Sequence, residues 1–182
     1  MPSLDIIMGP MFAGKSCELI KRIRILKVLK KNYIVVKPAI DNRYDENMVV
    51  SHNFEKEHCF TLENLNDIFN HLNNDIDTIF IDEGQFFSDL KNVVITLVEE
   101  YKINVVVTGL DGDSNRNKFG QILDLIPYST NCTKINACCI MCMDGTPAQF
   151  TFRKPTDNNN QILIGASDMF MSVCRNHYLN PV

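Results

Sequence analysis

The stretch that decides the fold lies near the N-terminus and reads Leu4-Asp5-Ile6-Ile7-Met8-Gly9-Pro10-Met11-Phe12-Ala13-Gly14-Lys15-Ser16. Its apolar beginning, Leu4–Met8, predicts a short buried strand. The remainder, Gly9–Ser16, matches the pattern G-x-x-x-x-G-K-[ST]. Apolar residues then recur at helical spacing, at Leu19, Ile23, Leu26 and Leu29. A strand, a glycine-containing loop and a helix therefore follow one another, which is the context that this motif requires.

The motif has a specific chemistry. Gly9 and Gly14 allow a tight turn in which backbone N–H groups point at phosphate oxygens, and the helix N-terminus adds a partial positive charge. Lys15 is expected to bridge the β- and γ-phosphates of a nucleotide, and the Ser16 hydroxyl to bind Mg²⁺. The sequence therefore predicts a phosphate-binding loop.

Further strands and helices alternate along the chain. Apolar runs predict strands at Tyr33–Val36, Thr78–Ile81, Asn104–Thr108 and Gln161–Ile164, and a second helical spacing joins Leu62, Leu65, Phe69 and Leu72. This alternation predicts an α/β fold with a parallel sheet flanked by helices, like that of P-loop nucleotide hydrolases. We expect a nucleotide-binding domain over residues 1–130 and a small metal-pinned subdomain over 131–182, with Asp157–Asn160 as a turn between two strands.

Length and charge narrow the function classes. The chain has 182 residues and a formal net charge of -4, and no apolar run long enough to cross a membrane. We therefore expect a cytoplasmic protein without a membrane or nucleic-acid partner. Seven cysteines in such a chain favour metal ligation or burial over disulfides.

An acidic pair ends the predicted strand at Thr78–Ile81. We expect Asp82 to help hold Mg²⁺ and Glu83 to accept a proton from the group that attacks the γ-phosphate. From these residues alone, the attacking group can be a hydroxyl or a water molecule. A GTPase is disfavoured because Asn117-Lys118-Phe119-Gly120 lacks the aspartate that would read guanine, and a nucleoside-monophosphate kinase because arginines are few.

Two pairs of metal-ligating residues follow near the C-terminus. Cys139-x-x-Cys142 and Cys174-x-x-His177 together are enough for a closed tetrahedral Cys₃His zinc site, for which we expect a structural role. The neighbouring Cys138 is an alternative to Cys139, because spacing alone does not separate adjacent cysteines. The other cysteines are expected to be structural, and they are Cys17, Cys59 and Cys132.

With these motifs in place, the chain resembles the type II thymidine kinase family, which contains cellular and poxvirus-type enzymes. The resemblance runs almost end to end. Its ordered landmarks are Gly9–Ser16, Asp41-Asn42-Arg43-Tyr44, Asp82-Glu83-Gly84-Gln85-Phe86-Phe87, Gly109-Leu110-Asp111-Gly112, the two zinc pairs and Ser172-Val173-Cys174-Arg175.

The resemblance implies ATP-dependent phosphorylation of the 5′-hydroxyl of thymidine in nucleotide salvage for DNA synthesis, with Glu83 as general base and Arg43 offsetting charge on the transferred group. The implied ATP contacts are Gly9, Pro10, Met11, Phe12, Ala13, Gly14, Lys15, Ser16, Asp41, Arg43, Asp82 and Gln85. The implied nucleoside contacts are Met11, Phe86, Leu110, Ser114, Thr151, Gln161, Ile162, Leu163, Ile164, Gly165 and Phe170. The thymine base would be held mainly by backbone groups of a lasso at about Thr151–Phe170, tied by zinc.

The resemblance also carries expectations that the residues themselves do not express. These are a homotetramer and feedback inhibition by thymidine triphosphate. Ser114 takes a position where the family often has phenylalanine, and Phe170 one where tyrosine is common. Because the chain ends at Val182, soon after His177, it is closest in size to the short viral members.

Two other classes of function compete with this interpretation. A P-loop ATPase acting on nucleic acid would carry a basic C-terminal region. Residues 131–182 instead hold Lys134, Arg153, Lys154 and Arg175 against Asp144, Asp157 and Asp168. A catalytically inactive scaffold is disfavoured because Lys15, Ser16, Asp82 and Glu83 are all present.

Overall fold

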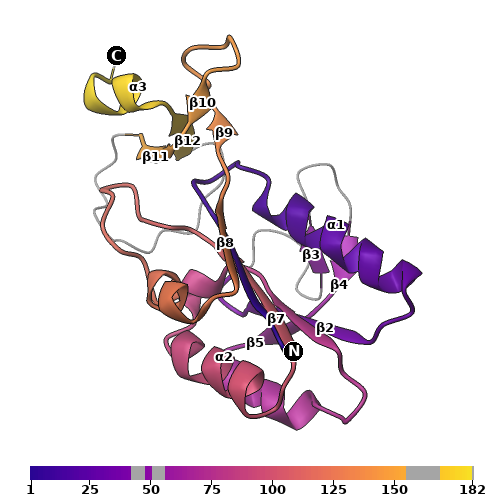
Figure 1. The fold of residues 1–182 in the computed structure, drawn as a ribbon. Helices are drawn as coiled ribbons and strands as arrows, with labels where there is room; N and C mark the ends of the chain where they lie inside the picture. The colour runs from indigo at the N-terminus through magenta and orange to yellow at the C-terminus, as the bar shows by residue number, and fades with distance from the viewer. Residues whose placement is uncertain (42–47, 51–55, 155–168, 182) are drawn as a thin grey trace.

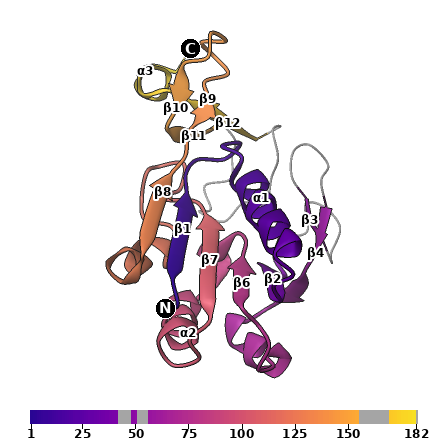
Figure 2. The same ribbon diagram turned by 45° about the vertical axis from the view of Figure 1, so that its right-hand side comes forward.

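The computed structural model describes residues 1–41, 48–50, 56–154 and 169–181. Its centre is a six-stranded, entirely parallel sheet with the order β5-β2-β6-β7-β1-β8. Figure 1 shows the whole fold, and Figure 2 shows β8, β1, β7 and β6 side by side, with their carboxyl ends pointing toward the C-terminal subdomain. The strands are β1 (Leu4–Met8), β2 (Tyr33–Pro38), β5 (Phe60–Leu62), β6 (Thr78–Ile81), β7 (Asn104–Gly109) and β8 (Asn131–Lys134). The predicted α/β class is confirmed.

Helices cover both faces of the sheet, because successive side chains of a strand point to opposite sides. In β1, Ile7 packs with α1 (Lys15–Val28), whereas Ile6 packs into the larger core on the other face. That larger core is closed by α2 (Leu90–Glu99) and by the 3₁₀ helices η1 (Leu65–His71) and η3 (Ile122–Tyr128). Both faces of the strands are thus buried, which explains their continuous apolar sequences.

The helix predicted from the spacing of Leu62 to Leu72 is only partly correct. Leu62 belongs to strand β5, and residues 65–71 form a 3₁₀ helix instead of an α-helix. The Asp89 carboxylate accepts hydrogen bonds from the backbone N–H groups of Leu65 at 3.2 Å and Asn66 at 2.8 Å. This tertiary contact fixes the start of the segment after a short strand that spacing alone does not reveal.

Two other predictions concern the end of the large sheet and the segment at residues 157–164. The large sheet includes β8, so it continues past residue 130, the boundary predicted from the sequence, to Lys134. The strand predicted at residues 161–164 and the turn at 157–160 lie outside the described residues.

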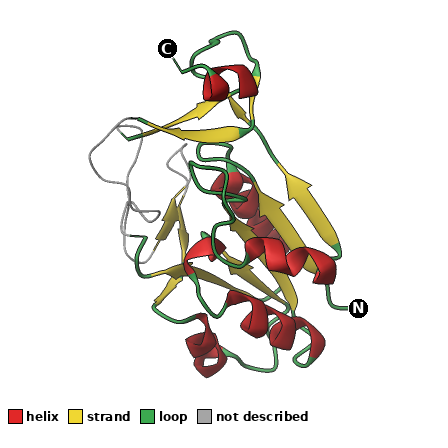
Figure 3. Ribbon diagram, turned by 90° about the vertical axis from the view of Figure 1, so that its left-hand side faces the viewer, coloured by secondary structure: helices red, strands yellow, loops and turns green. Residues whose placement is uncertain are grey.

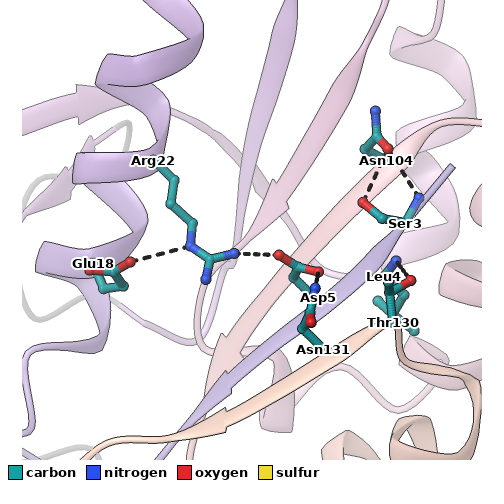
Figure 4. Close-up of polar contacts among 8 residues, drawn as sticks. All are labelled: Ser3, Leu4, Asp5, Glu18, Arg22, Asn104, Thr130 and Asn131. Carbon is teal, nitrogen blue, oxygen red and sulfur yellow. Dashed lines mark hydrogen bonds and ion pairs between the residues drawn. The ribbon is translucent and has the colours of Figure 1, made fainter. Parts of the chain in front are cut away.

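Polar contacts fix the position of β1 between its neighbours (Figure 4). Arg22 of α1 forms an ion pair with Asp5 of β1 at 2.6 Å, and the other oxygen of Asp5 accepts a hydrogen bond from Asn131 of β8 at 3.0 Å. At the start of β1, the backbone N–H of Ser3 donates to Asn104 Oδ1 at 3.0 Å. These contacts fix β1 relative to α1, β7 and β8, and so fix the start of the loop that follows β1.

A smaller unit sits beyond the carboxyl ends of the strands (Figure 3). Two antiparallel pairs build it, β9 (Ala137–Cys138) with β10 (Pro147–Ala148) and β11 (Phe150–Arg153) with β12 (Phe170–Val173), followed by α3 (Arg175–Leu179). Phe12 and Ala13 of the Gly9–Ser16 loop pack against its apolar core. The unit is therefore held directly over that loop.

The remaining short elements are β3 (Met48–Val50), which pairs with β4 (Lys56–His58), and the 3₁₀ turn η2 (Gly84–Phe86) that follows β6. Within the described part of the chain, no helix has the length and apolar character needed to span a membrane.

Candidate active site and metal centre

The Gly9–Ser16 loop joins β1 to α1 in the conformation that its glycines permit. Gly9 has a φ of +155°, and a Cβ there would lie 2.2 Å from the carbonyl oxygen of Ile135. Gly14 adopts a left-handed conformation, φ 82°, immediately before the first residue of α1. Neither position accepts a side chain without strain, because the first lacks room and the second has an unfavourable backbone. The Lys15 ammonium folds back to donate to the carbonyl oxygen of Pro10 at 2.8 Å.

Three side chains from three different strand ends meet at Asp82. The Ser16 hydroxyl donates to Asp82 Oδ2 at 2.9 Å, and the Thr108 hydroxyl donates to Oδ1. Asp82 follows β6 and Thr108 lies in β7, whereas Ser16 lies in the first turn of α1, after β1. Because parallel strands present their carboxyl ends at one edge, the two predicted magnesium-side residues are brought into direct contact.

The Asp82 carboxylate is buried, and this shapes its protonation. Loss of solvation, followed by repulsion from the Glu83 carboxylate, raises the pKa of Asp82 to about 6, against the opposing hydrogen bonds from Thr108 and Ser16. A further repulsive contribution comes from Asp41, one of the predicted ATP contacts. A buried carboxylate next to two others is an environment that favours a bound cation.

Glu83 occupies a backbone conformation that few non-glycine residues adopt. Its φ of 51° and ψ of 41° lie in the left-handed region, directly between β6 and η2. Its Oε2 accepts a hydrogen bond from Gln85 Nε2 at 2.5 Å, and its side chain is buried. The Oε1 of Gln85 in turn accepts from the backbone N–H of Leu110 at 3.0 Å. The Glu83 carboxylate is thus held by the side-chain amide of Gln85, whose oxygen is in turn held by the backbone of Leu110.

The structure gives Gln85 these two contacts within the protein, and a contact with ATP stays a prediction. Thr108 was missed by the sequence reasoning. A hydroxyl residue near the end of an otherwise apolar strand, in a chain with a phosphate-loop motif, is the signal that could have identified it.

Several predicted nucleoside-site residues lie around the same edge of the sheet. The backbone N–H of Met11 donates to the hydroxyl of Thr151 at 3.0 Å, which joins the Gly9–Ser16 loop to β11. Phe86 meets Phe119 edge to face, with ring centroids 5.4 Å apart. Leu110 is held through its backbone N–H, which donates to the side-chain amide oxygen of Gln85. The remaining described positions are Ser114, in the loop after β7, and Phe170, in β12. Arg43 and Gln161, Ile162, Leu163, Ile164 and Gly165 lie outside the described residues.

An open hollow of about 490 Å³ adjoins the Gly9–Ser16 loop on the side of β8. Its lining combines apolar residues such as Ile7, Ala13 and Ile135 with polar and charged ones. The full lining comprises Ile7, Ala13, Gly14, Cys17, Glu18, Lys21, Arg22, Thr133 and Ile135. A hollow of this size and character suits a planar base with an attached sugar.

The four predicted zinc ligands converge in the C-terminal unit. The donor atoms of Cys139, Cys142, Cys174 and His177 all lie within 4.8 Å of one another. The Cys142 and Cys174 sulfurs are 3.8 Å apart, and His177 Nδ1 lies 3.5, 3.4 and 3.4 Å from the sulfurs of Cys139, Cys142 and Cys174. A tetrahedral zinc site with ordinary bond lengths has S–S edges of about 3.8 Å and S–N edges of about 3.6 Å. The arrangement therefore fits zinc.

The structure also separates the two adjacent cysteines. Cys139 is buried within the cluster, whereas Cys138 is exposed and belongs to strand β9. Although desolvation opposes it, hydrogen bonds from the backbone of Cys174 and Cys142 and from His177 lower the pKa of the Cys139 thiol. Thiolate character at this position suits a metal ligand.

Comparisons with known proteins identify the family of this chain. A family model described as thymidine kinase matches residues 2–178. A protein named thymidine kinase from Oryza sativa subsp. japonica is 40% identical over 182 residues, which cover 97% of this chain and 66% of the rice protein. Thymidine kinase a of Arabidopsis thaliana is 38% identical over 181 residues, covering 97% of this chain and 75% of the relative.

These relatives are plant proteins, which argues against the viral grouping that the short chain suggested. The family-model match, which spans nearly the whole chain, and the two relatives confirm the resemblance drawn from the motifs. This chain belongs to the thymidine kinase family of enzymes.

Proposed function

We propose that this protein transfers the γ-phosphoryl group of Mg·ATP to the 5′-hydroxyl of thymidine and so forms thymidine monophosphate. The observation that carries the proposal is the meeting of Ser16, Thr108 and Asp82 at one edge of the sheet, with Glu83 as the next residue. Together with the family, this juxtaposition supports a site for phosphoryl transfer to a nucleoside hydroxyl.

On the donor side, the backbone N–H groups of Gly9–Ser16 would bind the phosphates. Lys15 would exchange its bond to Pro10 for the β- and γ-phosphate oxygens, since its ammonium already lies on the loop. Ser16 and Asp82 would hold Mg²⁺, which would neutralise charge on the phosphates. The hollow beside the loop would take the adenine and ribose, because it opens directly from Ala13 and Gly14.

On the acceptor side, Glu83 would remove the proton of the 5′-hydroxyl as that oxygen attacks phosphorus. Its carboxylate is fixed by Gln85, so it meets the acceptor without reorganising. Arg43 would offset the charge of the transferring group. Met11, Phe86, Leu110, Ser114, Thr151 and Phe170 would surround the nucleoside, with backbone groups of residues 161–165 reading the base.

The C-terminal unit would bind one structural zinc ion through its three thiolates and the imidazole. A closed set of four protein ligands leaves no position for substrate, so the ion would supply rigidity and take no part in the chemistry. Its place over the Gly9–Ser16 loop suits a cover that keeps water away from the phosphates.

We also propose that the chain forms a homotetramer that is inhibited by thymidine triphosphate. The outer face of α1 offers a contact surface, because Ile25, Val28 and Leu29 are exposed apolar side chains close together on the helix. Thymidine triphosphate could occupy the nucleoside site with its phosphates directed at the Gly9–Ser16 loop. Light scattering of the purified protein, and initial rates with added thymidine triphosphate, test the two statements separately.

The decisive assay measures ADP release from Mg·ATP in parallel reactions with no acceptor, thymidine, deoxycytidine or thymidine monophosphate. We expect release that depends on thymidine and yields thymidine monophosphate. Release that is independent of acceptor would identify an ATPase instead. Release only with thymidine monophosphate would identify a nucleotide kinase.

A further inference from the structure

The loop between β7 and η3, residues 110–121, lies against Gln85 at both ends. At its start, the backbone N–H of Leu110 donates to Gln85 Oε1 at 3.0 Å. A Cβ on the preceding Gly109 would lie 2.2 Å from the same oxygen. Near the other end, Gly120 has a φ of +61°, and a Cβ there would lie 2.2 Å from the carbonyl oxygen of Gln85. The two ends of this β7–η3 loop therefore close around one buried residue.

The interior of the β7–η3 loop is held by Asp113. One carboxylate oxygen of Asp113 accepts from the backbone N–H groups of Asn115 and Asn117, each at 2.8 Å. The backbone N–H of Asp113 donates to the carbonyl oxygen of Asn117 at 2.9 Å. The backbone N–H of Arg116 donates to the carbonyl oxygen of Asp113 at 3.0 Å. These bonds make residues 113–117, the tip of the loop, a compact turn.

The tip contacts the C-terminal unit at Tyr178, and its Arg116 guanidinium also lies 5.9 Å from the centroid of the Phe150 ring. The Tyr178 hydroxyl donates to the carbonyl oxygen of Ser114 at 2.7 Å. The Arg116 guanidinium lies over the Tyr178 ring, 4.5 Å from its centroid, so the same residue binds the tip twice. The Tyr178 ring also contacts the ring of Phe150 of β11, with 5.1 Å between centroids.

Tyr178 is in turn positioned by the Cys₃His cluster. It lies in α3, a helix of five residues that has no buried side chain of its own. The backbone N–H of Tyr178 donates to the carbonyl oxygen of Cys174 at 2.9 Å, and the preceding residue is the ligand His177. A helix this short has little stability of its own, so its place depends on contacts with its neighbours, here the ligand cluster and the rings of Phe150 and Phe152.

We propose that Tyr178 is a positioning residue that couples the zinc cluster to the catalytic carboxylate through the β7–η3 loop. The path runs from the cluster to Tyr178, to Ser114, along the loop to Leu110, and through the Gln85 amide to Glu83. This inference rests on the proposed function, which assigns Glu83 to the reaction. Zinc then serves the nucleoside site by holding the loop that borders it, in addition to stabilising the C-terminal unit.

The variant Tyr178→Phe tests the coupling, because it removes the hydroxyl and keeps the ring that Arg116 and Phe150 contact. Tyr101→Phe is the matched control, since Tyr101 is 51% exposed and contacts Phe69 on the opposite part of the domain. For Tyr178→Phe we expect a KM for thymidine about threefold to tenfold higher, with the KM for Mg·ATP unchanged. Hydrogen exchange should quicken at the amides of Leu110, Asn115 and Asn117, while zinc content stays at the wild-type value.

The outcomes separate cleanly. The coupling would be overturned if Tyr178→Phe kept wild-type exchange rates and a wild-type KM for thymidine. Loss of zinc from this variant would also overturn it. So would changes of equal size in the control Tyr101→Phe. If the wild-type protein does not phosphorylate thymidine while exchange still quickens in the loop of Tyr178→Phe, the coupling stands and the proposed function fails. Chelation of zinc from the wild-type protein should quicken exchange at the same amides, and unchanged exchange there would also overturn the proposal.

Discussion

The hydroxyl of Ser16 donates a hydrogen bond to Oδ2 of Asp82 at 2.9 Å, although the two residues are 66 positions apart in the chain. The strands that precede them, β1 and β6, are not neighbours, because β7 lies between these strands in the sheet. The bond therefore spans the position of β7, and Thr108 of that strand donates to the other oxygen of the same carboxylate, Oδ1. The two halves of the expected magnesium site are thus joined by a direct hydrogen bond.

Replacing Glu83 by glutamine should abolish most of the phosphoryl transfer. The amide keeps an acceptor for Gln85 but cannot take a proton, so kcat should fall at least about 100-fold while the KM for Mg·ATP changes little. Steady-state kinetics measures both quantities. Glu63→Gln, at an exposed position, serves as control and should match the wild type. A Glu83→Gln enzyme with near-normal kcat would contradict the role of general base.

Replacing Asp82 by asparagine should stabilise the magnesium-free protein while removing its activity. Burial raises the pKa of Asp82 from 3.8 to about 6, so its favourable contribution to folding is present below about pH 4 and lost as the pH rises through about 6. At pH 7.5 the ionised group opposes folding. We expect Asp82→Asn to raise the free energy of unfolding by about 1 to 3 kcal/mol at that pH.

The difference between Asp82→Asn and the wild type should shrink as the pH is lowered toward 4. Urea unfolding at several pH values, without added Mg²⁺, measures this difference. The exposed Asp75→Asn should show no comparable pH-dependent gain. A gain that is absent at pH 7.5, or that grows toward pH 4, would run against the inferred burial effect.

Replacing Thr108 by valine should weaken the use of magnesium. Valine has nearly the same shape as threonine but leaves Asp82 without one of its hydrogen-bond donors, which orient the carboxylate. We expect the Mg²⁺ concentration for half-maximal rate to rise about tenfold. Thr108→Ser retains the hydroxyl and should stay close to the wild type. Equal magnesium dependence in the valine and serine variants would show that the hydroxyl is unimportant.

The adjacent cysteines provide a matched pair for the metal site. Cys139→Ala removes a buried member of the cluster, so bound zinc should fall from about one ion per chain to nearly none, with a lower Tm. Cys138→Ala alters an exposed neighbour and should retain zinc and Tm. Metal analysis by mass spectrometry and thermal unfolding measure the two effects. Zinc retained in Cys139→Ala but lost in Cys138→Ala would reverse the assignment.

Sequence alone determined the features that depend on neighbouring residues. The Gly9–Ser16 loop and the four metal ligands are visible as local patterns, because a tight turn and a C-x-x-C pair each need particular residue types at fixed short spacing. The parallel α/β class also followed from sequence, since strands buried on both faces carry continuous apolar runs. The ordered motifs then indicated the family.

Only the tertiary structure decided which distant residues meet. Thr108 and Tyr178 carry no recognisable motif, and their importance comes from Asp82 and Ser114, which strand order and chain folding bring to them. Leu62 has helical spacing to its successors, yet pairing with β2 places it in a strand. Cys139 is distinguished from Cys138 by burial in the cluster. Local patterns specify backbone geometry, whereas contacts between remote segments depend on the packing of the whole sheet and its helices.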